Sequence, residues 1–315
     1  MKVLKYFLLS VFILLTLLFS CNYLINDMND ELRFQQANFP FVKTPVGFGN
    51  KTYRVLSYSC FGENSIHKYG ENIKSIAKEA AASSLYGGED GWQVRIYTDV
   101  EVPTIFKKEV RSINPMLLFV NIIGNEAVLK TNGMTWRFIP MADPWVDIAC
   151  FRDLDSVIFK REEAAVREFL ASEDKEVCHV MRDHPLHTAK IMGGMWCFRN
   201  EINRPLAKSL LIKILSKAQK RVPGIREAKK NNDQHVLEYY IWPIVKKQTM
   251  VHDAYHCWWS PGGRPFPSQR QIIGPDAEPF IGCPARPCIY DVKVIDFLLC
   301  PQECRPKMHQ DWAYC

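Results

Sequence analysis

Two aspartates separated by one residue, Asp153 and Asp155, are the side chains whose spacing most directly indicates chemistry. Two such carboxylates at a strand end can share one hard divalent cation, Mn²⁺ or Mg²⁺, while the phosphate oxygens of a substrate complete its coordination. The pair therefore predicts a metal site for a phosphorylated ligand. The alternative is a solvated turn in which Asp155 or Ser156 caps the segment that follows.

The elements around this pair indicate how it is positioned. The segment from Val146 to Phe151, apolar except for Asp147, predicts a central strand, which places Arg152–Ser156 at its carboxyl end, where open α/β sheets bind ligands. The sequence of strands and helices predicts an α/β fold with a mostly parallel sheet. Further strands are expected at 53–59, 93–97, 116–123 and 178–181, and helices at 72–84, 161–170 and 205–220.

The N-terminal segment predicts a membrane anchor. Lys2 and Lys5 precede an apolar run that extends from Tyr6 to Ile25, about the twenty residues that span a bilayer. This pattern predicts a single-pass type II protein of the Golgi or endoplasmic reticulum membrane with a lumenal domain. A cleaved signal peptide is the alternative. We expect a cytosolic tip and signal anchor at 1–25, a stem at 26–51, a folded domain at 52–270 and a cysteine-rich segment at 271–315.

The cysteines agree with export. Of the 11 cysteines, Cys21 lies at the edge of the apolar run, and the other ten are an even number suited to disulfides in an oxidising compartment. Five of them lie between Cys283 and Cys315. A zinc site is the alternative, but the spacings lack the usual paired CxxC arrangement, so disulfides are favoured.

Composition excludes some classes of function. The net charge of +6 is mildly basic, and the basic residues are dispersed along the chain. No basic stripe with interleaved aromatic rings is present, so we expect no nucleic-acid partner.

Several sequence blocks carry a resemblance to a known family. In order, they are Phe151–Ser156, Arg161–Val166, Met181–Pro185 and Gly193–Trp196. These blocks resemble a family of uncharacterised glycosyltransferase-like proteins, over roughly residues 52–270. The resemblance implies a GT-A-like fold, a single nucleotide-binding α/β domain whose DxD motif carries manganese and the donor pyrophosphate.

The resemblance also implies roles for individual residues. Asp153 would contact the metal or the donor ribose, and Asp155 would bind the metal directly. Asp233 and Gln234 are similar to the pair that retaining enzymes of this fold place beside the donor sugar. A late histidine would be the third metal ligand, with His252 the best candidate and His256 the second; the alternative is a histidine without metal.

Other residues suit a sugar nucleotide by their chemistry. Arg152 can donate several hydrogen bonds to a diphosphate, or form a salt bridge with a carboxylate instead. Gly193 and Gly194 allow the backbone to approach a sugar, and Trp196 offers a flat face for a sugar ring or a core side chain. Asp183, in a loop that leaves a strand, is a candidate catalytic residue or a structural one.

The sequence therefore predicts a metal-dependent glycosyltransferase that moves a sugar from a nucleotide-diphosphate donor to the hydroxyl of a glycan or glycoconjugate acceptor. A non-catalytic, cysteine-rich glycan-binding protein is the main alternative. A metal-dependent phosphohydrolase is the third, although Arg152 interrupts the apolar run that such enzymes place before their aspartate pair.

Overall fold

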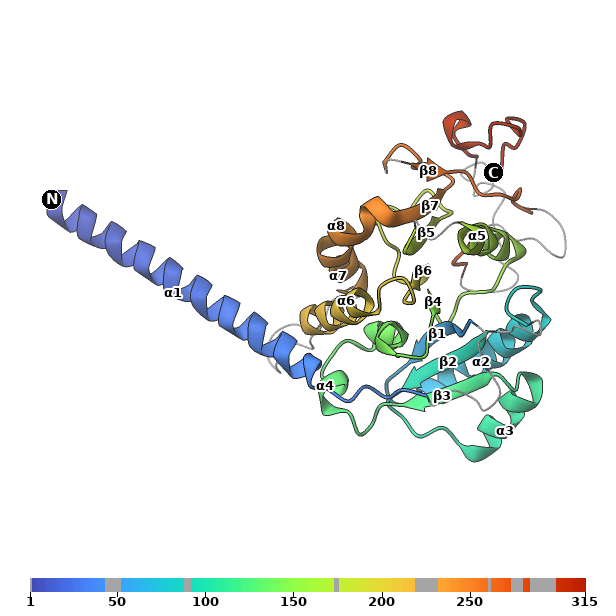
Figure 1. The fold of residues 1–315 in the computed structure, drawn as a ribbon, viewed down its shortest axis with the longest axis horizontal. Coiled ribbons are helices and arrows are strands. Elements are labelled where there is room, and N and C mark those ends of the chain that lie inside the picture. The colour runs from blue at the N-terminus through green and yellow to red at the C-terminus, as the bar shows by residue number, and fades with distance from the viewer. Residues whose placement is uncertain are drawn as a thin grey trace.

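The computed structural model describes residues 2–42, 52–87, 92–172, 176–218, 232–259, 262–272, 280–283 and 299–315. The described part of the chain is built on an eight-stranded sheet with the order β3-β2-β1-β4-β6-β5-β7-β8 (Figure 1). The strands are β1 (Arg54–Cys60), β2 (Gln93–Thr98), β3 (Leu117–Asn121), β4 (Ile148–Arg152), β5 (Cys178–Arg182), β6 (Met195–Arg199), β7 (Thr249–Asp253) and β8 (Gly263–Arg264).

The sheet is mostly parallel, as the sequence predicts. Strands β1, β2, β3 and β4 are mutually parallel neighbours, and so are β5, β7 and β8, whereas β6 is antiparallel to both β4 and β5. Because β6 reverses the direction twice, the carboxyl ends of β1, β4, β5 and β7 lie at one edge. The chain builds outward from β1 through β2 to β3 and then returns to place β4 on the other side of β1. The strand order therefore changes direction between β1 and β4, where open α/β sheets bind ligands.

Helices cover the two faces of the sheet and enclose separate apolar cores. One face carries α2 (Ser65–Ala82), α3 (Thr104–Ile113) and α5 (Lys160–Ala171). The other carries the 3-10 segment η1 (Gly133–Ala142), α6 (Arg204–Lys217) and α7 (Asn232–Val236), which continues as η2 (Leu237–Ile241). Short helical segments complete the described structure: α4 (Glu126–Leu129), α8 (Trp242–Val245), η3 (Lys246–Gln248) and η4 (Gln302–Cys304).

Local sequence accounts for the helices. Helix α2 buries Ile73, Ile76, Ala77 and Ala80, whose three- and four-residue spacing places them on one face. Helix α6 starts where the side chain of Asn203 accepts a hydrogen bond from Leu206 N at 2.9 Å, with a proline in the first turn. The apolar face of α2 thus orients that helix, and the capping residues of α6 determine where it begins.

The N-terminal helix α1 (Lys2–Gln35) projects from the domain and meets it at its C-terminal end (Figure 1). There Phe34 is buried, and Glu31 Oε1 lies 3.6 Å from Nζ of Lys213 on α6. The predicted type II anchor and the Golgi or endoplasmic reticulum location are wrong: within the described residues, no helix has both the length and the apolar character needed to cross a membrane. The helix does not end after its apolar run but continues through Asp30, Glu31 and Arg33 to Gln35.

Disulfides are present, as the sequence predicts. Cys150 of β4 is bonded to Cys197 of β6, Cys257 to Cys304, and Cys300 to Cys315. Cys283 is also disulfide-bonded. In the described part of the chain, Cys60 and Cys178 are free and buried. The C-terminal bonds hold Cys300 and Cys315 within the same apolar core as α2 and α5.

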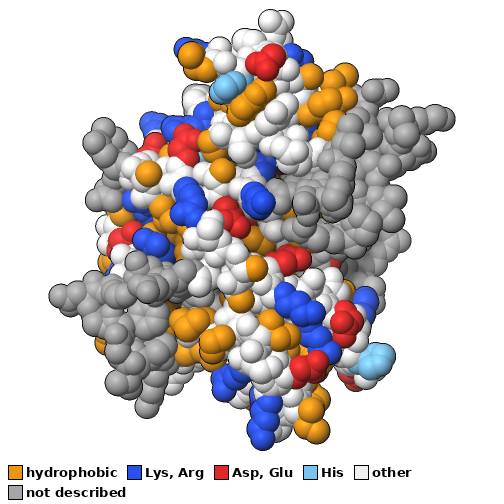
Figure 2. All heavy atoms as spheres, turned by 90° about the vertical axis from the view of Figure 1, so that its right-hand side faces the viewer, with side chains coloured by type: hydrophobic (Ala, Val, Ile, Leu, Met, Phe, Trp, Pro, Cys, Tyr) orange, Lys and Arg blue, Asp and Glu red, His pale blue; other side chains and the backbone are white. Residues whose placement is uncertain are grey.

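Charges are mixed on the surface. Figure 2 shows one face of the molecule, on which the described Lys and Arg side chains are interspersed with Asp and Glu. The described part of this face is neither predominantly positive nor predominantly negative, in keeping with the dispersed basic residues of the sequence.

Candidate active site

A cavity of about 150 Å³ lies at the carboxyl ends of β1 and β4, where the strand order changes direction. Its walls come from residues 59–61 at the end of β1, residues 153–155 after β4, Met134 and Arg137 of η1, and Tyr69 of α2. The predicted carboxylate pair therefore lies where the topology of an open α/β sheet places ligands.

The turn after β4 presents the two carboxylates to this cavity. Leu154 is buried in the core beneath α2 and α5, while Asp155 is exposed and the Asp153 side chain is 48% exposed. The amide of Ser156 donates to the carbonyl of Asp153 at 3.1 Å and closes the turn. The buried leucine thus anchors the turn, and its two neighbours supply hard oxygen atoms of the kind that Mg²⁺ and Mn²⁺ bind.

Arg137 links Asp153 to Asp233. One guanidinium nitrogen bonds Asp153, and the other bonds Asp233 at 2.5 Å. The side chains of Arg137 and Asp233 are 4% and 3% exposed, so this ion pair is largely shielded from water. Burial lowers the pKa of Arg137, but the two carboxylates outweigh that effect and raise it above its usual value. A permanent cation therefore fixes the orientation of both carboxylates.

Gly193 and Gly194 pack directly against these acids. A methyl group on Gly193 would overlap the carboxylate of Asp233 and come within 2.7 Å of the Arg137 guanidinium, and one on Gly194 would overlap the carboxylate of Asp153. Both positions therefore require glycine in this arrangement. The structure thus brings together Asp153, Asp155, Asp233 and both glycines of the sequence prediction. Gln234 follows Asp233 on α7 and is partly buried.

Arg152 does not reach the cavity. Successive residues of a strand point to opposite faces, so Arg152 points away from the face that carries η1. It is buried, with Nε 2.7 Å from Glu162 Oε1 of α5, and Tyr86 donates to the same oxygen at 2.9 Å. The predicted diphosphate contact is therefore replaced by the salt bridge that was its alternative.

Trp196 is a core residue rather than a sugar platform. It is fully buried on β6, and its ring centroid lies 4.5 Å from that of Phe151 and 5.4 Å from that of Phe138. Trp196 is paired in register with Phe151 on β4, so both side chains enter the core under η1 and α6.

His252 lies away from the carboxylate pair. It is buried on β7, which is separated from β4 by β6 and β5. Its Nδ1 is 2.8 Å from His179 Nε2, and its Nε2 is 3.3 Å from Glu168 Oε2. Burial lowers the pKa of His252, although Glu168 opposes this shift. The described residues contain no group of three or more His, Cys, Asp or Glu side chains that could hold a metal ion.

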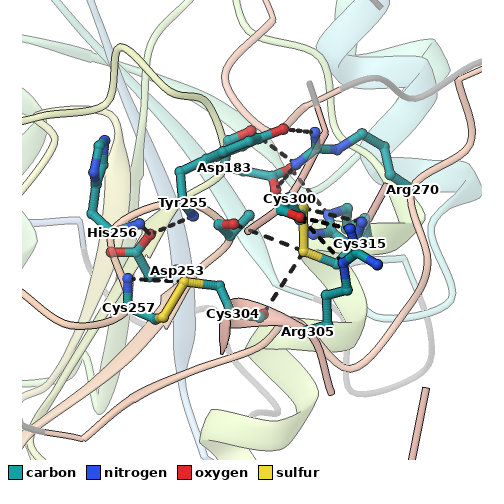
Figure 3. The surroundings of a disulfide bond; sticks show 12 residues. Asp183, Asp253, Tyr255, His256, Cys257, Arg270, Cys300, Cys304, Arg305 and Cys315 are labelled. Atoms are coloured by element: carbon teal, nitrogen blue, oxygen red, sulfur yellow. Dashed lines mark hydrogen bonds and ion pairs between the residues drawn. A yellow bond between two sulfur atoms is a disulfide. The ribbon is translucent and has the colours of Figure 1, made fainter. Parts of the chain in front are cut away.

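Two other predicted residues have structural surroundings. Asp183, after β5, is fully buried, and its Oδ1 accepts from Arg270 at 2.5 Å (Figure 3). Both its oxygens also accept from Arg161 at 3.0 Å, and Oδ2 accepts from Ile281 N. Although burial opposes it, the two arginines hold the pKa of Asp183 below its usual range. Asp183 thus ties the sheet to the C-terminal segment. His256, the second metal candidate, stacks on Trp259 instead.

Sequence reasoning missed Arg137. The signal for it is an arginine inside an otherwise apolar run, Trp136–Met141, because a buried guanidinium requires carboxylate partners. Its partners are 16 and 96 residues away in the sequence, so they could not be identified from spacing.

The domain, with a mostly parallel sheet, flanking helices and a carboxylate pair at the switch point, fits a GT-A-like fold. No protein-family profile and no curated protein sequence matches the chain.

Similar solved structures include the apo form of the bifunctional glycosyltransferase WbbM (12% identity, 70% of this chain and 42% of that chain, TM-score 0.43). Mouse xyloside xylosyltransferase 1 is also similar (11% identity, 66% of this chain and 89% of that chain, TM-score 0.40). A third is a mannosyltransferase from Pyrobaculum calidifontis in complex with GDP-mannose and Mn²⁺ (12% identity, 60% of this chain and 61% of that chain, TM-score 0.35). The chain thus spans less than half the length of WbbM. Because these TM-scores lie below 0.5, we base the proposed function on the geometry of the site.

Proposed function

We propose that the protein is a glycosyltransferase that moves a sugar from a nucleotide-diphosphate donor to an acceptor hydroxyl. The observation that carries this proposal is the pair Asp153 and Asp155, which flanks the buried Leu154 and opens on a cavity at the switch point of the sheet. A divalent ion, Mn²⁺ or Mg²⁺, would be held there by the two carboxylates and would neutralise the charge that develops on the leaving diphosphate.

The donor set fits such an ion. Two carboxylates provide part of an oxygen shell, and a metal that works on phosphates takes its remaining ligands from the substrate and from water. Asp153 is half-exposed even while Arg137 holds it, so one side of its carboxylate faces the cavity. Arg137 fixes this carboxylate before the donor arrives, which reduces the reorganisation that catalysis would otherwise need.

The glycine pair and Asp233 would complete the donor site. Because Gly193 and Gly194 have no side chains, the loop before β6 lies against Asp233 and Asp153. We assign Asp233 as a positioning residue, since its carboxylate is buried and engaged by Arg137. Gln234, its neighbour on α7, stays a predicted contact to the donor sugar.

The test is turnover of nucleotide sugars by the purified full chain. UDP- and GDP-sugars should be hydrolysed or transferred in the presence of Mn²⁺, and chelation should abolish release of the nucleoside diphosphate. Asp155→Asn keeps the shape but removes the charge, so the rate should fall by at least about a hundredfold. Metal-independent turnover, or full activity in the Asp155→Asn variant, would contradict the proposal. If no donor is turned over while a glycan still binds, the non-catalytic glycan-binding alternative is favoured.

A further inference from the structure

A second group of residues lies on the same edge of the sheet, beyond β7, and the donor site does not use it. It comprises His256, Trp258 and Trp259 after β7 and Lys190 from the connection between β5 and β6; we call it the aromatic platform. Trp258 is 57% exposed and Trp259 is 36% exposed, which is unusual for large rings on a folded domain.

The platform is rigid. The backbone amide of His256 donates to Asp253 Oδ1 at 2.6 Å, and its Nε2 donates to the carbonyl of Pro185 at 2.9 Å. The ring of His256 stacks on Trp259 with centroids 3.9 Å apart and an interplanar angle of 12°. The residue between His256 and Trp258, Cys257, is disulfide-bonded to Cys304 (Figure 3). Side chains that are already ordered lose little entropy when a ligand binds.

The aromatic rings of the platform are not equally accessible to a ligand. The ammonium group of Lys190 lies 4.7 Å from the centroid of Trp259, whose ring also stacks on His256. Trp258 lies nearly perpendicular to His256, with 6.0 Å between the ring centroids, and more than half of its surface remains exposed. The platform therefore offers one exposed indole beside a cation with several hydrogen-bond donors.

One short segment joins the platform to the donor site. Lys190 covers Trp259, and three residues later Gly193 packs against Asp233, with Gly194 against Asp153. Three residues of chain span at most about 11 Å. Because β4 and β7 are three strand spacings apart, about 14 Å, a ligand that starts at the donor site and extends along the sheet edge over β6 and β5 would reach the platform.

We propose that the aromatic platform binds the carbohydrate chain of the acceptor, with a sugar ring stacked on Trp258 and its hydroxyls bonded by Lys190. This inference rests on the proposed function, which requires an acceptor next to the donor site. An indole presents a flat apolar face to the C–H face of a sugar, and the neighbouring ammonium matches the hydroxyl groups at the ring edge. The exposed area of one or two indoles is small compared with the roughly 800 Å² that each partner of a stable protein complex buries.

The experiment is a ligand-detected NMR titration of the full chain with neutral oligosaccharides: cellohexaose, maltohexaose, mannohexaose and chitohexaose. At least one should bind the wild-type protein, and Trp258→Ala should weaken that binding by about tenfold or more through loss of the ring face. Trp258→Phe should recover part of the affinity because it restores a flat ring. The matched control is Trp145→Ala: Trp145 is 58% exposed but precedes β4 and so lies at the opposite edge of the sheet.

Binding that is equal in Trp258→Ala and Trp145→Ala, or no binding of any of the four oligosaccharides to the wild type, would overturn the proposal. Mn²⁺-dependent hydrolysis of nucleotide sugars, measured on the same samples, separates the two ideas. If nucleotide sugars are hydrolysed but Trp258→Ala leaves oligosaccharide binding unchanged, the platform does not bind the acceptor, and the proposed function still holds. Absence of hydrolysis, together with binding that depends on Trp258, would remove the transferase proposal and leave the platform as a glycan-binding site.

Discussion

Gly194 lies so close to Asp153 that a single methyl group on the glycine would overlap the carboxylate. The contact joins the loop before β6 to the turn after β4, two segments that the sequence separates by about 40 residues but that the antiparallel pairing of β4 with β6 places side by side. Any side chain at Gly194 must therefore move the carboxylate proposed to bind the metal.

Gly194→Ala should lower metal-dependent turnover more than it lowers stability. The methyl group would displace Asp153, and a small misplacement of a catalytic group can cost about a hundredfold in rate. Gly124→Ala is the matched control, because a methyl group there would meet no atom within 4 Å. Thermal melting of both variants separates unfolding from loss of activity, and equal activity in the two would show that the contact is unimportant.

Arg137→Met should destabilise the protein strongly. It leaves the buried carboxylate of Asp233 without its cation, and breaking a buried ion pair from one side costs about 3–5 kcal/mol. The double variant Arg137→Met with Asp233→Leu should recover much of the free energy of unfolding, measured by urea denaturation, but not the activity. If Arg137→Met alone is as stable as the wild type, the ion pair between Arg137 and Asp233 does not stabilise the fold.

His187 should make the protein less stable in acid. Burial lowers the pKa of His187 from 6.5 to about 3 in the folded protein. Between these two values the unfolded chain binds a proton that the folded protein does not, so the free energy of unfolding falls as the pH falls from 6.5 towards 3.

His187→Asn should flatten this decline, since asparagine does not titrate and can still accept the hydrogen bond that Asp183 N donates to the histidine ring. Exposed His67→Asn is the control and should leave the decline unchanged. Urea denaturation at several pH values between 7 and 3 makes the comparison. An unchanged pH dependence in His187→Asn would contradict the assignment.

Loss of the disulfide between Cys257 and Cys304 should release the C-terminal segment from β7 (Figure 3). Replacing both cysteines with alanine should lower stability by about 2–4 kcal/mol, the usual contribution of such a bond. Limited proteolysis should then cut within residues 299–315 first, while the buried bond between Cys150 and Cys197 protects the sheet. Equal protease resistance in the variant and the wild type would show that other contacts, such as that of Asp183 with Arg270, suffice.

The sequence could predict the part of the fold that depends on local pattern. The apolar run before Asp153 identifies β4, and its carboxyl end identifies the position of the carboxylate pair. The period-two alternation of a strand also explains why Arg152 points away from the cavity, although the direction of each face is not visible until the neighbouring helices are placed.

The sequence could not predict features that depend on strand order. Strand β6 enters antiparallel between β4 and β5, which places β7, and with it His252, far from the carboxylates. The two glycines before Trp196 suggest either a sugar platform or a core side chain there, but they do not predict strand β6, which buries this tryptophan. Strand β7 and helix α3 were not predicted either. All of these features depend on which strands pair over long sequence distances, and this pairing cannot be read from one sequence.

The most direct test of the account is calorimetric titration of the purified full chain with UDP and with GDP, each with and without MnCl₂. We expect one of the two nucleotides to bind only when Mn²⁺ is present. Asp155→Asn should abolish this binding, whereas the control Asp311→Asn, an exposed aspartate in the C-terminal segment, should keep it. Nucleotide binding that needs no metal, or that survives Asp155→Asn unchanged, would contradict the central claim that Asp153 and Asp155 hold a metal-bound donor.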